Sequence, residues 1–207
     1  MIMTEKEITC TTSNSYSTLN QLTIDTKNIW LVFHGMGYLS KYFLKYFKNL
    51  NPIDNYIIAP QAPSKYYIQP KMHVGANWLT RDNTEVGMQN IMNYIDAVFE
   101  TENIPEDRNL FVFGYSQGVS IATRYVIKRQ LQPSQLVLHS GGIPKEFKQN
   151  DFAFLNSECK VKLIYGKQDE YLDKARIEIE IRRAAELFEK RLEVLPFDGK
   201  HVVNVDY

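Results

Sequence analysis

The chain has 207 residues, which is enough for one well-developed hydrophobic core and too few for two ordinary domains. Its 24 basic and 24 acidic side chains give a formal net charge of zero, and no basic stripe stands out, which argues against nucleic acid as a partner. The N-terminal residues lack the apolar centre of a secretory signal, and no later run is long and apolar enough to span a bilayer. We therefore expect a single domain over residues 1–207, located in the cytoplasm, without a membrane span.

The first part of the chain alternates short apolar runs with helical patterns, which predicts a mostly parallel central sheet with helices on both faces. Residues 6–24 predict two strands around a Ser-Asn-Ser turn, forming an antiparallel hairpin at the sheet edge. A continuous apolar run at 29–33 predicts a buried parallel strand, and a helix is expected over 39–50. A further strand is expected at 56–59. The stretch 64–80, of mixed polarity, is interpreted as a long loop over one end of the sheet.

The rest of the chain continues the same alternation. Apolar side chains at helical spacing predict helices, and short apolar runs predict strands. No insertion is long enough to form a separate lid domain. The expected helices lie at 84–100, 119–129 and 173–190, and the expected strands at 109–113, 136–138, 161–165 and 192–195.

Residues 114–118 read Gly-Tyr-Ser-Gln-Gly and fit the G-x-S-x-G pattern of a nucleophile elbow. In such a turn the serine hydroxyl projects above the sheet between a strand and a helix. Side chains two positions before and after the serine would collide with neighbouring backbone, so glycine is needed there. The pattern follows an apolar strand and opens a helical run, which is the context it requires. Ser116 is therefore the candidate nucleophile.

Serine is a poor nucleophile unless a base takes its proton, and elbow-containing hydrolases supply the partners in the chain order Ser, then Asp or Glu, then His. The chain has four histidines, His34, His73, His139 and His201. Only His201 lies beyond the last expected strand and downstream of a suitable acid. The acid should directly follow a strand at the carboxyl end of the sheet, which favours Asp169. Its rivals are Glu170, Asp173 and Asp198, the last of which is expected to serve a local turn or cap.

Stabilising a tetrahedral oxyanion needs two hydrogen-bond donors. One should be the backbone N–H of Gln117, directly after the nucleophile. The second should come from the His-Gly-Met-Gly loop at 34–37, whose glycines allow close approach of the backbone, and we expect it to be the N–H of Met36. The alternative is that this loop is an ordinary glycine-rich turn between a strand and a helix.

These residues together resemble the phospholipase/carboxylesterase branch of the α/β-hydrolases, which includes acyl-protein thioesterases. The resemblance implies an α/β-hydrolase fold and hydrolysis of a small-molecule carboxylic ester or thioester, with no cofactor and no metal. It spans nearly the whole chain. It is carried by Leu-Val-Phe-His-Gly-Met-Gly at 31–37, Ala-Pro-Gln-Ala-Pro at 59–63, Asn77-Trp78, the elbow at 114–118, and the surroundings of Asp169 and His201.

Three features depart from that family's pattern. Tyr38 stands where an acidic residue often follows the oxyanion loop, and Val119 stands where the second glycine after the elbow serine is usual. The chain also ends six residues after His201, so the usual closing helix should be missing or reduced. The sequence therefore leaves open how the candidate base is supported.

Substrate recognition is assigned to the stretch 64–80, where Tyr66, Tyr67 and Trp78 are expected to roof a pocket. For Trp78 a purely structural place in the core is the alternative. Ser116, Asp169 and His201 would also suit hydrolysis of another bond, such as a lactone or a peptide bond, because the shape of the pocket decides the substrate. A non-catalytic binding protein that retains the fold is the remaining alternative.

Overall fold

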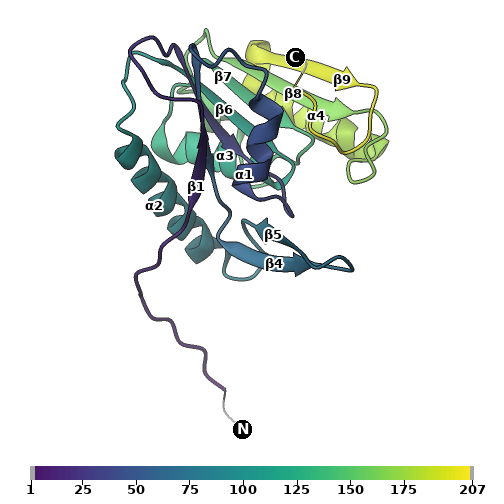
Figure 1. The fold of residues 1–207 in the computed structure, drawn as a ribbon. Coiled ribbons are helices and arrows are strands. Elements are labelled where there is room, and N and C mark those ends of the chain that lie inside the picture. Colours follow the sequence, from purple (N-terminus) through teal and green to yellow (C-terminus); the bar gives the residue numbers. More distant parts are fainter. Residues whose placement is uncertain (1–2, 206–207) are drawn as a thin grey trace.

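The computed structural model describes residues 3–205 and contains nine β-strands within that range. They are β1 (Tyr16–Leu19), β2 (Asn28–Phe33), β3 (Asn55–Pro60), β4 (Ser64–Ile68), β5 (His73–Asn77), β6 (Asn109–Tyr115), β7 (Gln135–His139), β8 (Lys160–Gly166) and β9 (Leu192–Phe197). Seven of them form one sheet in the order β1-β3-β2-β6-β7-β8-β9 (Figure 1). All neighbours in this sheet are parallel except β1 and β3, which confirms the mostly parallel sheet that the sequence predicts.

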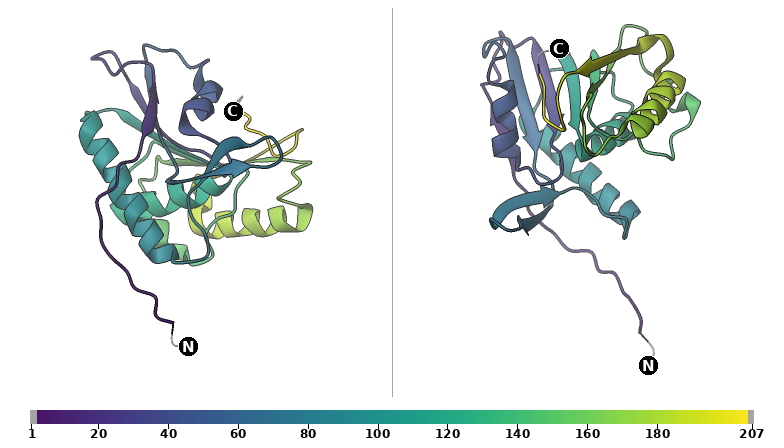
Figure 2. Two further views of the ribbon diagram at one scale, coloured as in Figure 1. Left: turned by 60° about the horizontal axis from the view of Figure 1, so that its bottom comes forward. Right: turned by 90° about the vertical axis from the view of Figure 1, so that its right-hand side faces the viewer.

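Helices cover both faces of the sheet, also as predicted. The α-helices are α1 (Ser40–Phe43), α2 (Thr84–Glu102), α3 (Gln117–Arg129) and α4 (Lys174–Phe188), and the short 3₁₀ helices are η1 (Leu44–Phe47), η2 (Gln149–Phe152) and η3 (Glu189–Arg191). Helices α2, α3 and α4 lie on one side of the sheet, and α1 lies on the other (Figure 2). None of the helices within residues 3–205 has the length and apolar character needed to cross a membrane.

The alternation of side chains along β2 shows how the sheet supports two separate cores. Leu31 and Phe33 are fully buried on the side of α2 and α3, and Val32 is fully buried on the side of α1. Successive strand residues point to opposite faces, so a strand covered by helices on both sides has to be apolar throughout. This explains the continuous apolar runs in the sequence. Packing on both faces holds β2 and β6 in place, and the candidate site lies at the ends of these strands.

The segment expected to form one helix over 39–50 is shorter and irregular. It is α-helical only over α1, continues as the 3₁₀ helix η1, and ends at Phe47. In a 3₁₀ helix the side chains three positions apart lie on the same line. Leu44 and Phe47 therefore both reach the core, where they are 6% and 3% exposed. Packing of these side chains outweighs the weak helix propensity of the aromatic residues in this segment.

The predicted N-terminal hairpin is wrong in one respect. The edge strand is antiparallel, as expected, but it is a single strand, β1, paired with β3 through the register Tyr16 to Pro60. Residues 3–13 form no strand and are all exposed. This stretch has too few apolar side chains to bury, so the strand forms only where the free edge of β3 offers backbone partners.

The long loop predicted over 64–80 is also corrected, because most of it is the two-stranded antiparallel hairpin β4–β5. The two strands pair with each other and not with the main sheet, and the hairpin projects from one end of the molecule (Figure 1). Strands of a two-stranded, largely exposed hairpin need no clean alternation of polarity, which is why the sequence pattern did not reveal them.

Candidate active site

Ser116 lies at the turn between β6 and α3, with φ 53° and ψ −119°. Such a backbone conformation costs energy for any residue except glycine. A Cβ atom added to Gly114 would lie 2.6 Å from the carbonyl oxygen of Gly118, and one added to Gly118 would overlap the carbonyl oxygen of Phe33. The Ser116 amide donates a hydrogen bond to the carbonyl of His139 at 2.8 Å. The two glycines thus permit the close approach that holds the serine in its strained turn.

The side chains of Ser116, His201 and Asp169 form a continuous hydrogen-bonded chain. The His201 Nε2 atom lies 3.0 Å from Ser116 Oγ, and its Nδ1 atom lies 2.7 Å from Asp169 Oδ2. The Asp169 side chain is fully buried, and its other oxygen accepts the backbone N–H groups of Tyr171 and Leu172 at 2.9 and 3.0 Å. Because a carboxylate can only accept, Nδ1 carries the imidazole proton and Nε2 is left to accept from the serine hydroxyl.

The rival carboxylates occupy other positions. Glu170 accepts the backbone N–H of His201 at 3.2 Å, and hydrogen bonds from its own backbone amide and that of His201 lower its pKa. Asp173 caps α4 by accepting the amide of Arg176, and Asp198 forms an exposed ion pair with Lys167. These groups do not gather into a metal site: within residues 3–205, no cluster of three or more His, Cys, Asp or Glu side chains could hold a metal ion.

The short segment that follows His201 is anchored without a helix. In the part that the structure describes, residues 202–205 are irregular. The Tyr115 hydroxyl donates to the carbonyl of His201 at 3.0 Å. The ring of His139, which is fully buried, places Nε2 2.9 Å from both the amide nitrogen and the carbonyl oxygen of Asn204. Burial lowers the pKa of His139 to about 4, so the ring is neutral at pH 7. Sequence reasoning set His139 aside because it lies before the last strand.

The loop that carries Met36 is fixed from beneath by His34, another fully buried histidine. Its Nε2 accepts the amide of Ala62 at 3.1 Å, and its Nδ1 therefore donates to the carbonyl of Gly35 at 2.8 Å. Burial lowers the pKa of His34 to about 4. A Cβ on Gly35 would lie 3.1 Å from the Ser116 Cβ, so this loop passes directly beside the serine. This packing gives the His-Gly pair a structural role that involves no proton transfer by His34.

The two amides proposed from the sequence as oxyanion donors belong to segments that adjoin the serine. Met36 belongs to the loop that passes beside Ser116, and Gln117 is the first residue of α3. Neither backbone N–H donates a hydrogen bond to another group within residues 3–205. Both donors therefore remain available to a ligand. The start of α3 adds the partial positive charge of its helix dipole at the same place.

The Gln117 side chain forms hydrogen bonds of its own, which could not be predicted from the sequence pattern. Its Oε1 accepts the amide of Trp78 at 2.9 Å, and its Nε2 donates to Asn77 Oδ1 at 2.6 Å and to the carbonyl of Leu79 at 2.9 Å. The Trp78 indole N–H donates to the carbonyl of His34 at 2.8 Å. These bonds tie the end of β5 to both the elbow and the oxyanion loop.

The three residues expected to line a pocket occupy different environments. Tyr66 and Tyr67 lie on β4 and are 39% and 63% exposed, whereas Trp78 is 2% exposed. The Tyr66 hydroxyl would lie 3.8 Å from a Cβ on Gly37, so it is close to the oxyanion loop. Trp78 packs edge-on against Phe33 in the core, which favours the structural alternative for this residue.

With this geometry established, comparison with known proteins identifies the family. The family model described as Phospholipase/Carboxylesterase matches residues 21–193. The chain belongs to this family. Among curated proteins, none matches the sequence significantly.

Solved structures support the assignment at the level of the fold. The chain superimposes on acyl-protein thioesterase 2 from Zea mays with a TM-score of 0.69 at 17% identity, covering 93% of each chain. The esterase PE8 gives a TM-score of 0.67 at 19% identity, again covering 93% of each chain. A phospholipase/carboxylesterase from Dyadobacter fermentans gives 0.63 at 16% identity, covering 94% of this chain and 92% of that one. The fold is that of the α/β-hydrolases, and as a member of this family the protein is an ester or thioester hydrolase.

Proposed function

We propose that the protein is a serine hydrolase that cleaves a carboxylic ester or thioester through an acyl-enzyme. The observation that carries the proposal is the hydrogen-bonded chain from Asp169 through His201 to Ser116, at 2.7 and 3.0 Å. In this proposal the amides of Met36 and Gln117 form the oxyanion hole. The arrangement has the geometry that nucleophilic catalysis by serine requires, with the base oriented by a buried third group.

The steps follow from the positions of these groups. Ser116 Oγ attacks the substrate carbonyl carbon while His201 Nε2 takes the hydroxyl proton. Asp169 holds the imidazole in the required tautomer and stabilises the imidazolium that forms. His201 then gives the proton to the departing alcohol or thiol, which leaves the acyl group on Ser116. A water molecule, deprotonated by His201, attacks the acyl-enzyme and releases the acid.

Membership of the family favours esters and thioesters over lactones and peptide bonds, which the same side chains would also serve. A non-catalytic binding role would not require an imidazole hydrogen-bonded between a buried carboxylate and a strained serine. The predicted cytoplasmic location stays a prediction.

Covalent labelling with a fluorophosphonate, combined with hydrolysis of p-nitrophenyl butyrate, tests the proposal. Ser116→Ala should abolish labelling and lower kcat by about 10⁴- to 10⁶-fold, and Asp169→Asn should lower kcat by about 10⁴-fold while the protein stays folded. The matched control is Ser157→Ala, which changes an exposed serine and should leave both readouts unchanged. Undiminished labelling or turnover in Ser116→Ala would rule out the assignment.

A further inference from the structure

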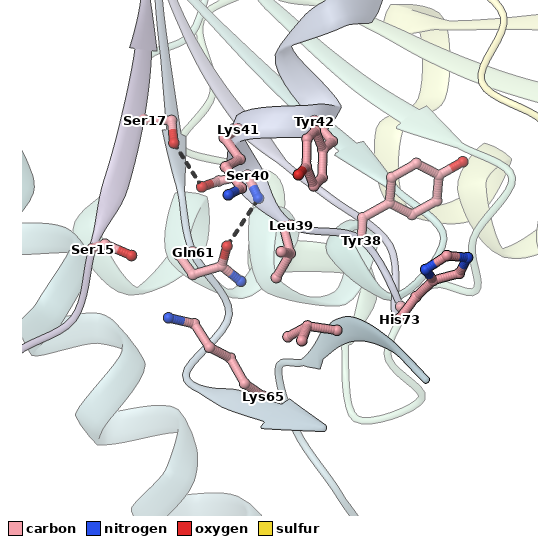
Figure 3. A pocket seen from close by; sticks show the side chains of 12 residues that line it. Ser15, Ser17, Tyr38, Leu39, Ser40, Lys41, Tyr42, Gln61, Lys65 and His73 are labelled. Atoms are coloured by element: carbon pink, nitrogen blue, oxygen red, sulfur yellow. Dashed lines mark hydrogen bonds between the residues drawn. The ribbon is translucent and has the colours of Figure 1, made fainter. Parts of the chain in front are cut away.

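A groove of about 640 Å³ opens beside the oxyanion loop, between the β4–β5 hairpin and α1 (Figure 3). It begins at Gly37, the residue after Met36. Because a Cβ on Gly35 would lie 3.1 Å from the Ser116 Cβ, and consecutive Cα atoms are about 3.8 Å apart, the Gly37 Cα is roughly 12 Å or less from the serine Cβ. A substrate whose reacting carbonyl lies at Ser116 can therefore extend into it.

The floor of the groove is polar and built from buried groups. Ser40 and Gln61 are 2% and 3% exposed, and the Ser40 amide donates to Gln61 Oε1 at 2.9 Å. The hydroxyls of Ser17 and Ser40 share one hydrogen bond at 2.9 Å (Figure 3). Two hydroxyls carry two hydrogens and this bond uses one of them, so a second O–H remains to donate to a ligand.

The rim of the groove is positively charged. Lys41 approaches it from α1 and Lys65 from β4, the imidazole of His73 lies beside them on β5, and among residues 3–205 no aspartate or glutamate lines it. Neither lysine forms an ion pair with a carboxylate within residues 3–205. The formal net charge of the whole chain is zero, so this charge is a local feature. Two lysine ammonium groups, of which that of Lys41 lies over the Tyr42 ring, and one hydroxyl that remains to donate are suited to a carboxylate or phosphate.

We propose that this groove binds a negatively charged group of the substrate, so that the preferred substrate is an ester or thioester that carries a carboxylate or phosphate several bonds from the reacting carbonyl. The inference rests on the proposed hydrolase function and adds the substrate class to it. The charged group belongs either to the acyl portion or to the leaving group, and the test distinguishes these two cases.

Matched pairs of charged and neutral esters test the proposal. For the acyl portion, mono-4-nitrophenyl glutarate is compared with 4-nitrophenyl valerate. For the leaving group, 4-carboxyphenyl butyrate is compared with 4-acetylphenyl butyrate. The wild-type protein should prefer the charged member of one pair in kcat/KM, after subtraction of spontaneous hydrolysis. The preference should arise in KM and decrease when NaCl is raised, because exposed ion pairs are screened.

The double variant Lys41→Gln/Lys65→Gln should lower the ratio of charged to neutral kcat/KM by about tenfold, since two exposed ion pairs are lost. The control Lys128→Gln/Lys190→Gln removes the same charge from exposed positions on α3 and η3 and should leave the ratio unchanged. Equal turnover of charged and neutral esters by the wild type, or an unchanged ratio in Lys41→Gln/Lys65→Gln, would overturn the groove assignment. Absence of any ester turnover, with Ser116 unlabelled, would instead overturn the proposed hydrolase function.

Discussion

The buried histidine that anchors the segment after His201 makes a quantitative prediction about stability. Burial is the main cause that lowers the pKa of His139 from 6.5 to about 4, with the nearby His201 lowering it further, while the hydrogen bond to the Asn204 carbonyl and, less strongly, Asp169 oppose the shift. The unfolded chain binds a proton at this residue below pH 6.5, whereas the folded protein does so only near pH 4. The stabilising contribution is therefore complete above pH 6.5 and is lost as the pH falls to 4. A pKa difference of one between the folded and unfolded states corresponds to about 1.4 kcal/mol, so the loss is about 3 kcal/mol.

Urea unfolding of the wild type and of His139→Gln at pH 7, 5.5 and 4 measures this contribution. At pH 7 the wild type should be more stable by about 1–3 kcal/mol, because glutamine does not reproduce the bonds to Asn204 and Ser140. Between pH 7 and pH 4 the advantage of the wild type in unfolding free energy should fall by about 3 kcal/mol, so that His139→Gln is as stable as the wild type or more stable at pH 4. All other titrating groups are common to both proteins. A difference that stays constant over this range would refute the neutral, buried state of His139.

Two further predictions concern the elbow. Gly118→Ala should destabilise the protein by at least about 4 kcal/mol in urea unfolding, because the added methyl group would overlap the Phe33 carbonyl. The control Gly87→Ala should change stability by less than about 1 kcal/mol, because its added Cβ would meet only the Leu79 side chain, at 3.1 Å. Gln117→Leu should lower Tm by roughly 5 °C and slow fluorophosphonate labelling, because it leaves the Trp78 amide without its acceptor. An unchanged Tm in Gln117→Leu would show that this side chain does not tie β5 to the elbow.

The features that the sequence predicted well are those set by local pattern. The apolar run of β2 and the turn at Ser116 follow from strand burial and from glycines that permit close backbone approach. The chain order of Ser116, Asp169 and His201 singled out residues whose side chains lie within hydrogen-bonding distance in the structure, although their catalytic role is a proposal. Element order and position relative to strand ends carry this information, so no long-range contact had to be known.

The features that the sequence did not reveal depend on long-range partners. The bond between His139 and Asn204 joins residues 65 positions apart, and the bonds from Gln117 to Asn77 and Leu79 span 40 and 38 positions. A lone histidine or glutamine has no periodicity that would mark such a partner. The β4–β5 hairpin escaped prediction for a related reason, since its strands pair only with each other and leave much of their surface exposed.

The departures from the family pattern are accommodated by neighbouring residues. Val119 occupies the place of a second glycine, and the space for its side chain comes from Gly141, where a Cβ would lie 2.5 Å from Val119 Cγ2. Tyr38 stands in place of an acidic residue, packs edge-on against Tyr115 and bonds to the Tyr46 hydroxyl at 3.2 Å. Burial raises the pKa of Tyr38 well above its usual value, so its side chain stays uncharged. Tyr38 therefore adds no negative charge to the lining of the groove, and this departure from the family pattern is compatible with the proposed anionic substrate.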